Sequence, residues 1–244
     1  MPEDLAAFDK VPAVTDYSEG TVVGIARPTT QEVELATKIL IAAPYGAIPG
    51  TTPLKVAQYF LEVSKGTYGA ELRKFTREWP VRANPVIHHL FIATKTFPEG
   101  DTTAWCAAFV NWCIARSLAK QPEMIGTAPG YFVNKGMAFD PAILVGTSRS
   151  AASGSFRCFP DKEGNPAAGD LIVWQTPGTE GMTKHCYGTG HVAFFLGREN
   201  GRYRVLGGNQ RDGISNGAVT MARWPRDIPA THKYFGIVSS KKTA

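Results

Sequence analysis

The sequence predicts an α+β domain in which helices come first and an antiparallel sheet of about five strands follows. In the first half of the chain, apolar residues recur at the spacing of one helix face. In the second half, short runs rich in β-branched and aromatic residues are separated by glycine, asparagine, aspartate and proline, which are strand and hairpin signals. Helices followed by strands, without regular alternation, are typical of the α+β class.

The helical half contains four segments with helix signals. A threonine at position 29 can cap the first helix, and Pro53 opens the second, because proline is favoured in the first turn. The four expected helices cover residues 29–43, 53–65, 84–97 and 106–116. Residues 1–30 are irregular and are expected to form an extended arm, which leaves residues 31–244 as a single domain.

The second half contains five short runs with the composition of strands. "GRENGRY" at 197–203 has the glycine and asparagine content of a hairpin turn between the second and third runs. The expected strands lie within residues 169–175, 190–199, 201–209, 217–225 and 234–240.

Composition excludes several classes of protein. The chain has 244 residues, of which 43% are hydrophobic and 19% are charged, and no apolar run reaches the roughly 20 residues that span a bilayer. The net charge of +5 suits an anionic partner, but the basic residues are scattered, which disfavours nucleic acid. The acidic N-terminus lacks the pattern of a signal peptide, so none is expected unless it has been removed. Four cysteines without a CxxC pair predict neither a disulfide scaffold nor a structural zinc site.

The stretch "TAWCAAFVNWC" places Cys106 and Cys113 in one expected helix. Seven residues of helix separate their Cα atoms by about 10 Å, whereas a disulfide needs Cα atoms within roughly 7 Å. The two cysteines therefore cannot pair. Cap candidates stand just upstream, at Asp101, Thr102 and Thr103.

The two cysteines are expected to differ in chemistry. Cys113 lies two turns into the helix and is expected to be packed core. Cys106 lies in the first turn, where unpaired N–H groups and the helix dipole stabilise a thiolate. The same N–H groups can donate to the oxyanion that forms when a thiolate attacks a carbonyl.

A nucleophilic cysteine needs a base and a group that orients the base. Of the five histidines, His191 is the best candidate by position, because it begins the strand "HVAFFLG" directly after "GTG". If residues 190–209 form a hairpin, Asn209 returns to the level of His191 and can accept the imidazole N–H. Gln210 is the alternative and should face the other side of the strand. On the residues alone, the favoured explanation of Asn209 is that of a turn residue in "GGNQRDG".

In this order, the motifs resemble those of the papain-like cell-wall hydrolases, namely the CHAP amidases and the related NlpC-type cysteine peptidases. The resemblance covers about residues 80–225. It is carried by the helix from Trp105 to Cys113, "GTSRSAASGSF" at 146–156, "PAAGDLIVW" at 166–174, "GHVAFFLG" at 190–197 and "GGNQ" at 207–210.

The resemblance implies a papain-like cysteine amidohydrolase that cleaves an amide bond in the peptide stem of peptidoglycan, without metal or cofactor. Carried over residue by residue, Cys106 is the nucleophile, His191 the general base and acid, and Asn209 the orienting group. The substrate-binding residues expected beside them are Trp105, Trp174, His185 and Gln210. Residues 175–190 are longer than a simple strand connection and are expected to overhang the groove.

Several alternatives stay open on the sequence. The same residues could run acyl transfer or deamidation on a protein target, or the chain could be an inactive cell-wall-binding module. The protein is expected to be a monomer. We expect it to be made in the cytoplasm and to reach the cell wall by non-Sec export or after lysis. It would be either a type VI secretion effector held in check by an immunity protein or a phage-type lysin. Cys158 and Cys186 could be paired or free.

Overall fold

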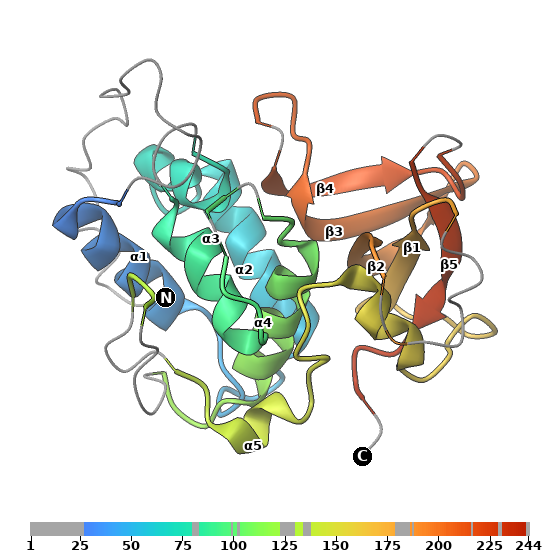
Figure 1. The fold of residues 1–244 in the computed structure, drawn as a ribbon, viewed down its shortest axis with the longest axis horizontal. Helices are drawn as coiled ribbons and strands as arrows, with labels where there is room; N and C mark the ends of the chain where they lie inside the picture. Colours follow the sequence, from blue (N-terminus) through green and yellow to red (C-terminus); the bar gives the residue numbers. More distant parts are fainter. Residues whose placement is uncertain are drawn as a thin grey trace.

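The computed structural model confirms an α+β architecture with a helical side and a sheet side (Figure 1). It describes residues 27–79, 83–98, 100–101, 103–122, 130–133, 138–178, 186, 188–215, 217–228 and 231–242. Most of the expected N-terminal arm lies outside the described residues. No helix in the described ranges is long and apolar enough to cross a membrane.

The four expected helices are present. They are α1 (Thr30–Ala42), α2 (Pro53–Lys65), α3 (Pro85–Leu90) and α4 (Cys106–Leu118). The helix expected over residues 84–97 is shorter than predicted, because α3 is followed by the short helical segment η3 (Phe91–Ala93) and ends there. Short helical segments that the sequence did not predict are η2 (Ala70–Thr76), α5 (Pro141–Leu144) and η4 (Ser153–Cys158). Each has seven residues or fewer, too short for the apolar periodicity that marks a helix in a sequence.

Local capping explains where the first two helices begin. Thr29 and Glu32 form a capping box, in which each side chain accepts from the backbone N–H of the other residue. Thr52 caps α2 in front of Pro53. The helix ends at Gly66, whose φ of 83° is left-handed and suits glycine.

All five expected strands form one antiparallel sheet in the order β4-β3-β2-β1-β5. The predicted hairpin joins β2 to β3 through Asn200 and Gly201, which both have positive φ, as a two-residue hairpin turn requires. The strands are β1 (Leu171–Gln175), β2 (Gly190–Glu199), β3 (Arg202–Gln210), β4 (Ala218–Trp224) and β5 (Lys233–Val238).

Helix α4 connects the helical side to the sheet. The ring centre of Phe109 in α4 lies 5.8 Å from that of Phe60 in α2 and 6.5 Å from that of Phe194 in β2. One side chain of α4 therefore packs against both a helix and the sheet. In Figure 1, α4 lies at the centre of the helical side, and α2 packs against the strands beside it. This central position fixes the start of α4 against the sheet.

The two faces of the sheet bury different sets of residues. Val192 and Phe194 of β2 belong to the main core that includes α4. Ala193 and Phe195 point the other way and pack with Trp174 in a second, smaller core. Strand alternation therefore assigns the residues from Val192 to Phe195 in turn to the helix side and to the second core.

Candidate active site

Helix α4 begins at Cys106 without a side-chain cap. Its N-cap residue is Trp105, and no side chain of the described residues makes a capping hydrogen bond there. The expected cap at Asp101 or Thr103 is therefore wrong for these two residues, whereas Thr102 lies outside the described residues. An uncapped first turn leaves backbone N–H groups available for an anion.

The thiol of Cys106 lies among those N–H groups. Burial raises its pKa, while the backbone N–H groups of Val192, Ala107 and Cys106 itself lower it. The N–H of Val192 comes from the residue that follows His191, so the sulfur lies next to the backbone of β2. Only 3% of Cys106 is exposed.

Cys113 has none of these neighbours. It is completely buried in the core, and burial alone raises the pKa of its thiol well above the ordinary value. Cys106 and Cys113 are both free thiols, as the spacing along one helix predicted.

His191 is the second residue of β2, and its ring lies beside the second core. The imidazole stacks on Trp224 at 4.6 Å with an interplanar angle of 7°, and Trp174 and His232 complete its surroundings. Burial lowers the pKa of His191 to about 3, with His232 adding to the decrease and the Gln210 side chain opposing it. The imidazole is therefore neutral near pH 7.

Gln210, instead of Asn209, shares the His191 face of the sheet. Asn209 has a φ of 56°, and the β3–β4 register shifts there, which marks a β-bulge. A Cβ placed on Gly207 would lie 2.9 Å from that of Ala193 and 3.1 Å from the Gln210 amide nitrogen. The bulge thus reverses the alternation and turns Gln210 toward the second core.

The side chain of Asn209 lies near the start of β4. Its Oδ1 would be 2.9 Å from a Cβ on Gly217, and the carboxylate of Glu78 would be closer still. Glu78 also accepts the indole N–H of Trp105 at 3.0 Å. Its role in joining α4, β3 and β4 was missed, because a single glutamate in "REWP" gives no sequence signal.

The thiol and the imidazole approach β2 from different sides. Cys106 belongs to the main core, which also contains Val192. The ring of His191 lies next to Trp174, on the opposite face of the sheet. Among the described residues, no hydrogen bond joins the two groups, and Nε2 of His191 and Oε1 of Gln210 are buried without a hydrogen-bond partner. The structure brings Cys106 to the backbone beside His191 but does not place the two reactive atoms in contact.

Neither of the two tryptophans expected to bind substrate offers a surface to it. Trp105 and Trp174 are completely buried, and their indole N–H groups donate to Glu78 and to the carbonyl of Arg226. The expectation that these two tryptophans line a groove is therefore not met, since both are packed as core residues. His185 lies outside the described residues.

Asp101 is a structural carboxyl close to the start of α4. Its two oxygens accept the N–H groups of Trp79 and Asn84, each at 2.8 Å. Burial raises its pKa to about 8, the two N–H groups oppose this, and Glu78 adds to the increase. Asp101 therefore links Trp79 and Asn84, which stand before and after residues 80–82, to the segment that precedes Cys106.

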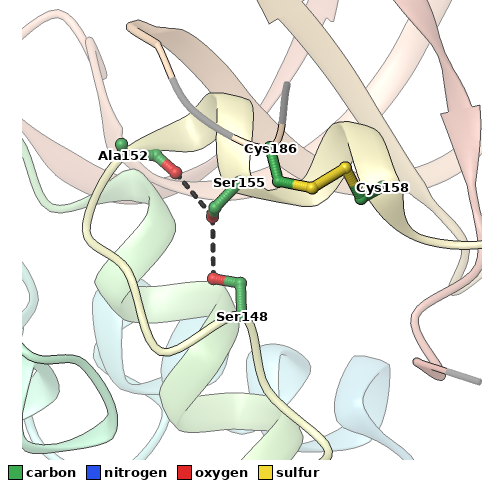
Figure 2. The surroundings of a disulfide bond; sticks show 5 residues. All are labelled: Ser148, Ala152, Ser155, Cys158 and Cys186. Carbon is green, nitrogen blue, oxygen red and sulfur yellow. Dashed lines mark hydrogen bonds between the residues drawn. A yellow bond between two sulfur atoms is a disulfide. The ribbon is translucent and has the colours of Figure 1, made fainter. Parts of the chain in front are cut away.

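Cys158 and Cys186 form a disulfide, which settles the alternative left open by the sequence. Figure 2 shows the bond at the end of η4, beside the hydrogen-bonded hydroxyls of Ser148 and Ser155. Asn111 of α4 donates to Ser148 and to the carbonyl of Ser150, so the same helix that begins at Cys106 also holds the segment that leads to η4.

A cysteine thus lies at a bare helix start and is packed on β2, the strand whose second residue is His191. Residues 98–209 match the family model of the CHAP domain, which confirms the resemblance inferred from the motifs. The CHAP domain is associated with amidase and peptidase activity, often on peptidoglycan. No curated protein and no solved structure matches the chain.

Proposed function

We propose that the protein is a cysteine amidohydrolase that cleaves an amide bond in the peptide stem of peptidoglycan. The observation that carries the proposal is the position of Cys106. Its sulfur lies among the N–H groups of the first turn of α4 and of Val192, inside the range that matches the CHAP domain. Cys113, on the same helix, lacks such donors and serves as an internal comparison.

The proposed reaction uses Cys106 as nucleophile and His191 as proton carrier. The thiol gives its proton to the imidazole as the sulfur attacks the amide carbonyl. Backbone N–H groups at the start of α4 donate to the tetrahedral oxyanion. His191 then protonates the leaving amine and activates the water that releases the acyl group from the sulfur.

This reaction requires His191 to turn toward the thiol. In the structure the ring is covered by Trp224 and is 4% exposed, and the raised pKa of the thiol and the lowered pKa of the imidazole leave both groups neutral. Catalytic hydrogen bonds are often long or misaligned before substrate binds. We propose that substrate displaces Trp224 and that the backbone at the start of β2 then turns, which brings the ring to the Cys106 side of the strand.

Gln210 is the better-supported orienting group, since its side chain lies on the His191 face of the sheet and opposes the fall in the pKa of the imidazole. The side-chain role expected of Asn209 stays a prediction. The geometry of the bulge supports a different contribution, in which the left-handed backbone of Asn209 aims Gln210 at the imidazole.

We place the reaction outside the reducing cytoplasm. The Cys158–Cys186 disulfide supports this, because disulfides persist in oxidising compartments such as the periplasm. Delivery as a type VI secretion effector with an immunity protein, or release as a lysin, stays a prediction.

The test is release of soluble fragments from dye-labelled sacculi. We expect Cys106→Ala to lower the rate by at least about 10³-fold, whereas Cys113→Ala, the control on the same helix, retains activity if it folds. Sacculi that stay intact with folded wild-type protein would contradict the proposal. Transfer of the acyl group to an added protein amine, in place of water, would favour the acyltransferase alternative.

A further inference from the structure

Glu78 is a partly buried carboxylate beside the start of α4, and one of its two oxygens is available to a ligand. Oε1 accepts the indole N–H of Trp105 at 3.0 Å. The other oxygen, Oε2, makes no hydrogen bond among the described residues, yet it is not enclosed by the protein. Burial raises the pKa of Glu78, and the bond from Trp105 opposes this increase. The carboxylate therefore has room for a donor from outside the protein.

No cation in the described part of the chain forms an ion pair with Glu78. The guanidinium of the preceding residue, Arg77, lies 2.6 Å from the carboxylate of Asp212 instead. The charged form of Glu78 also acts on Asp101, whose pKa it helps to raise. A partly buried carboxylate without a counter-ion keeps a desolvation cost that a cationic ligand would offset.

Asn209 places a second acceptor beside this carboxylate. A Cβ on Gly217 would lie 2.9 Å from Oδ1 of Asn209, and the carboxylate of Glu78 would be closer still, so both groups meet over the same glycine. The Asn209 side chain is partly exposed and makes no hydrogen bond among the described residues. A carboxylate and an amide oxygen side by side suit a ligand that carries several N–H donors.

The carboxylate is tied to the helix that carries the candidate nucleophile. Trp105, whose indole it accepts, is the N-cap residue of α4 and directly precedes Cys106. The backbone N–H of Glu78 donates to the carbonyl of Gly217 at 2.9 Å, which fixes the carboxylate from the sheet side as well. The acceptor is thus in place before a ligand binds, which reduces the entropy lost on binding.

Strand β3 holds Asn209 against the same end of α4. Gly208, the residue before it, has no side chain, and a Cβ there would lie 3.0 Å from that of Phe109 and nearer still to the ring of Trp105. This close approach brings the end of β3 onto the first turn of the helix. Glu78 and Asn209 therefore lie next to the turn that begins at Cys106.

We propose that Glu78, with the side-chain oxygen of Asn209 beside it, binds an ammonium group of the substrate. An ammonium has three N–H donors and can donate to both oxygens at once. The carboxylate carries most of the binding, because Asn209 contributes only a neutral acceptor. The inference rests on the proposed function, and it narrows the substrate class to peptides with a free amine near the scissile amide.

The first test is NMR titration of the full chain carrying Cys106→Ala, at constant ionic strength, which requires no cleavage. L-Alaninamide presents an α-amine, Nα-acetyl-L-lysinamide presents a side-chain amine, and Nα,Nε-diacetyl-L-lysinamide presents neither. We expect saturable shifts at Asn209 and Gly217 with an amine ligand, and the tighter of the two amines identifies the position of the ammonium group. Equal binding of the diacetyl compound, or no shift with either amine, would overturn the subsite.

Charge removal at Glu78 is the second test. Glu78→Gln keeps an oxygen for the indole N–H of Trp105, so the fold should be retained, and thermal unfolding checks this. Amine binding should weaken at least about tenfold, as the loss of a bond between charged groups predicts. Glu34→Gln, which removes an exposed carboxylate of α1, is the matched control and should bind the amine like wild type. Undiminished binding by folded Glu78→Gln would rule out Glu78 as the acceptor.

Cleavage separates a binding role of Glu78 from a structural one. Muropeptides with a free amine are compared with the same muropeptides after acetylation of that amine. Acetylation should lower kcat/KM of wild type at least about tenfold and that of Glu78→Gln much less. A purely structural role would lower both substrates by the same factor in Glu78→Gln, which would contradict the inference. Failure of folded wild type to cleave either substrate would instead contradict the proposed function, and the binding tests would still decide the subsite.

Discussion

Gln210 and His191 lie on the same face of neighbouring strands, and the Gln210 side chain opposes the fall in the pKa of the imidazole. The left-handed φ of Asn209, one residue before Gln210, produces this arrangement. Regular alternation would instead have turned Asn209 toward His191 and Gln210 away from it. A backbone irregularity of one residue thus decides which amide meets the candidate base.

Substitutions at Asn209 separate a side-chain role from a backbone role. Asn209→Gly removes the amide but keeps a residue that adopts positive φ, so we expect kcat/KM on labelled peptidoglycan to stay within about threefold of wild type. Asn209→Ala should cost about 1 kcal/mol of stability through backbone strain. Gln210→Ala should lower kcat/KM at least roughly tenfold, because the imidazole loses its orienting group. A large loss in Asn209→Gly with none in Gln210→Ala would restore Asn209 as the orienting residue.

Removing the ring that covers His191 should change its protonation. Trp224→Ala exposes the imidazole, so its pKa should rise from about 3 toward the ordinary value. The measurement is an NMR titration of the His191 ring signals, and the expected rise exceeds about one pH unit. Met221→Ala, at an exposed position on the same strand, should leave the titration unchanged. An unchanged titration in Trp224→Ala would show that this ring does not control access to His191.

The two free thiols should differ in reactivity and in pH dependence. Burial raises the pKa of Cys106, so its alkylation by iodoacetamide should accelerate as the pH rises toward 9 and above, without a plateau below pH 7. Cys113 should react only on unfolding. Peptide mapping of the alkylated protein measures both rates. A fast, pH-independent reaction at Cys106 near pH 6 would instead indicate a resting thiolate–imidazolium pair.

The disulfide should contribute measurably to stability. It closes a loop with a sequence separation of 28, so Cys158→Ser with Cys186→Ser should lower the free energy of unfolding by roughly 2–4 kcal/mol. Guanidinium unfolding followed by tryptophan fluorescence gives this difference, and reduced wild type should match the double variant. Thiol titration of unreduced, unfolded protein should find only Cys106 and Cys113. Four reactive thiols would contradict the pairing.

The sequence was sufficient for the order and type of the main elements, because each carries a local signal. Thr29 and Pro53 mark helix starts, and the asparagine–glycine turn fixes the β2–β3 hairpin. The placement of Cys106 at a helix start and of His191 at a strand start followed from the same signals.

The parts of the candidate site that were not predicted depend on contacts between distant segments. Nothing in "GGNQ" indicates that Asn209 adopts a left-handed conformation, and without it the two amides exchange faces. Trp105 and Trp174 were expected at a groove, but their burial depends on Glu78 and on the β4–β5 connection. The pairing of Cys158 with Cys186 likewise required the fold.

The most direct measurement of the central claim is mass spectrometry of the protein after rapid acid quench with purified muropeptides. We expect an acyl adduct on the peptide that contains Cys106 in wild type and in Cys113→Ala, and no adduct in Cys106→Ala. Product formation that persists in Cys106→Ala, or an adduct on a residue other than Cys106, would contradict the assignment of Cys106 as the nucleophile.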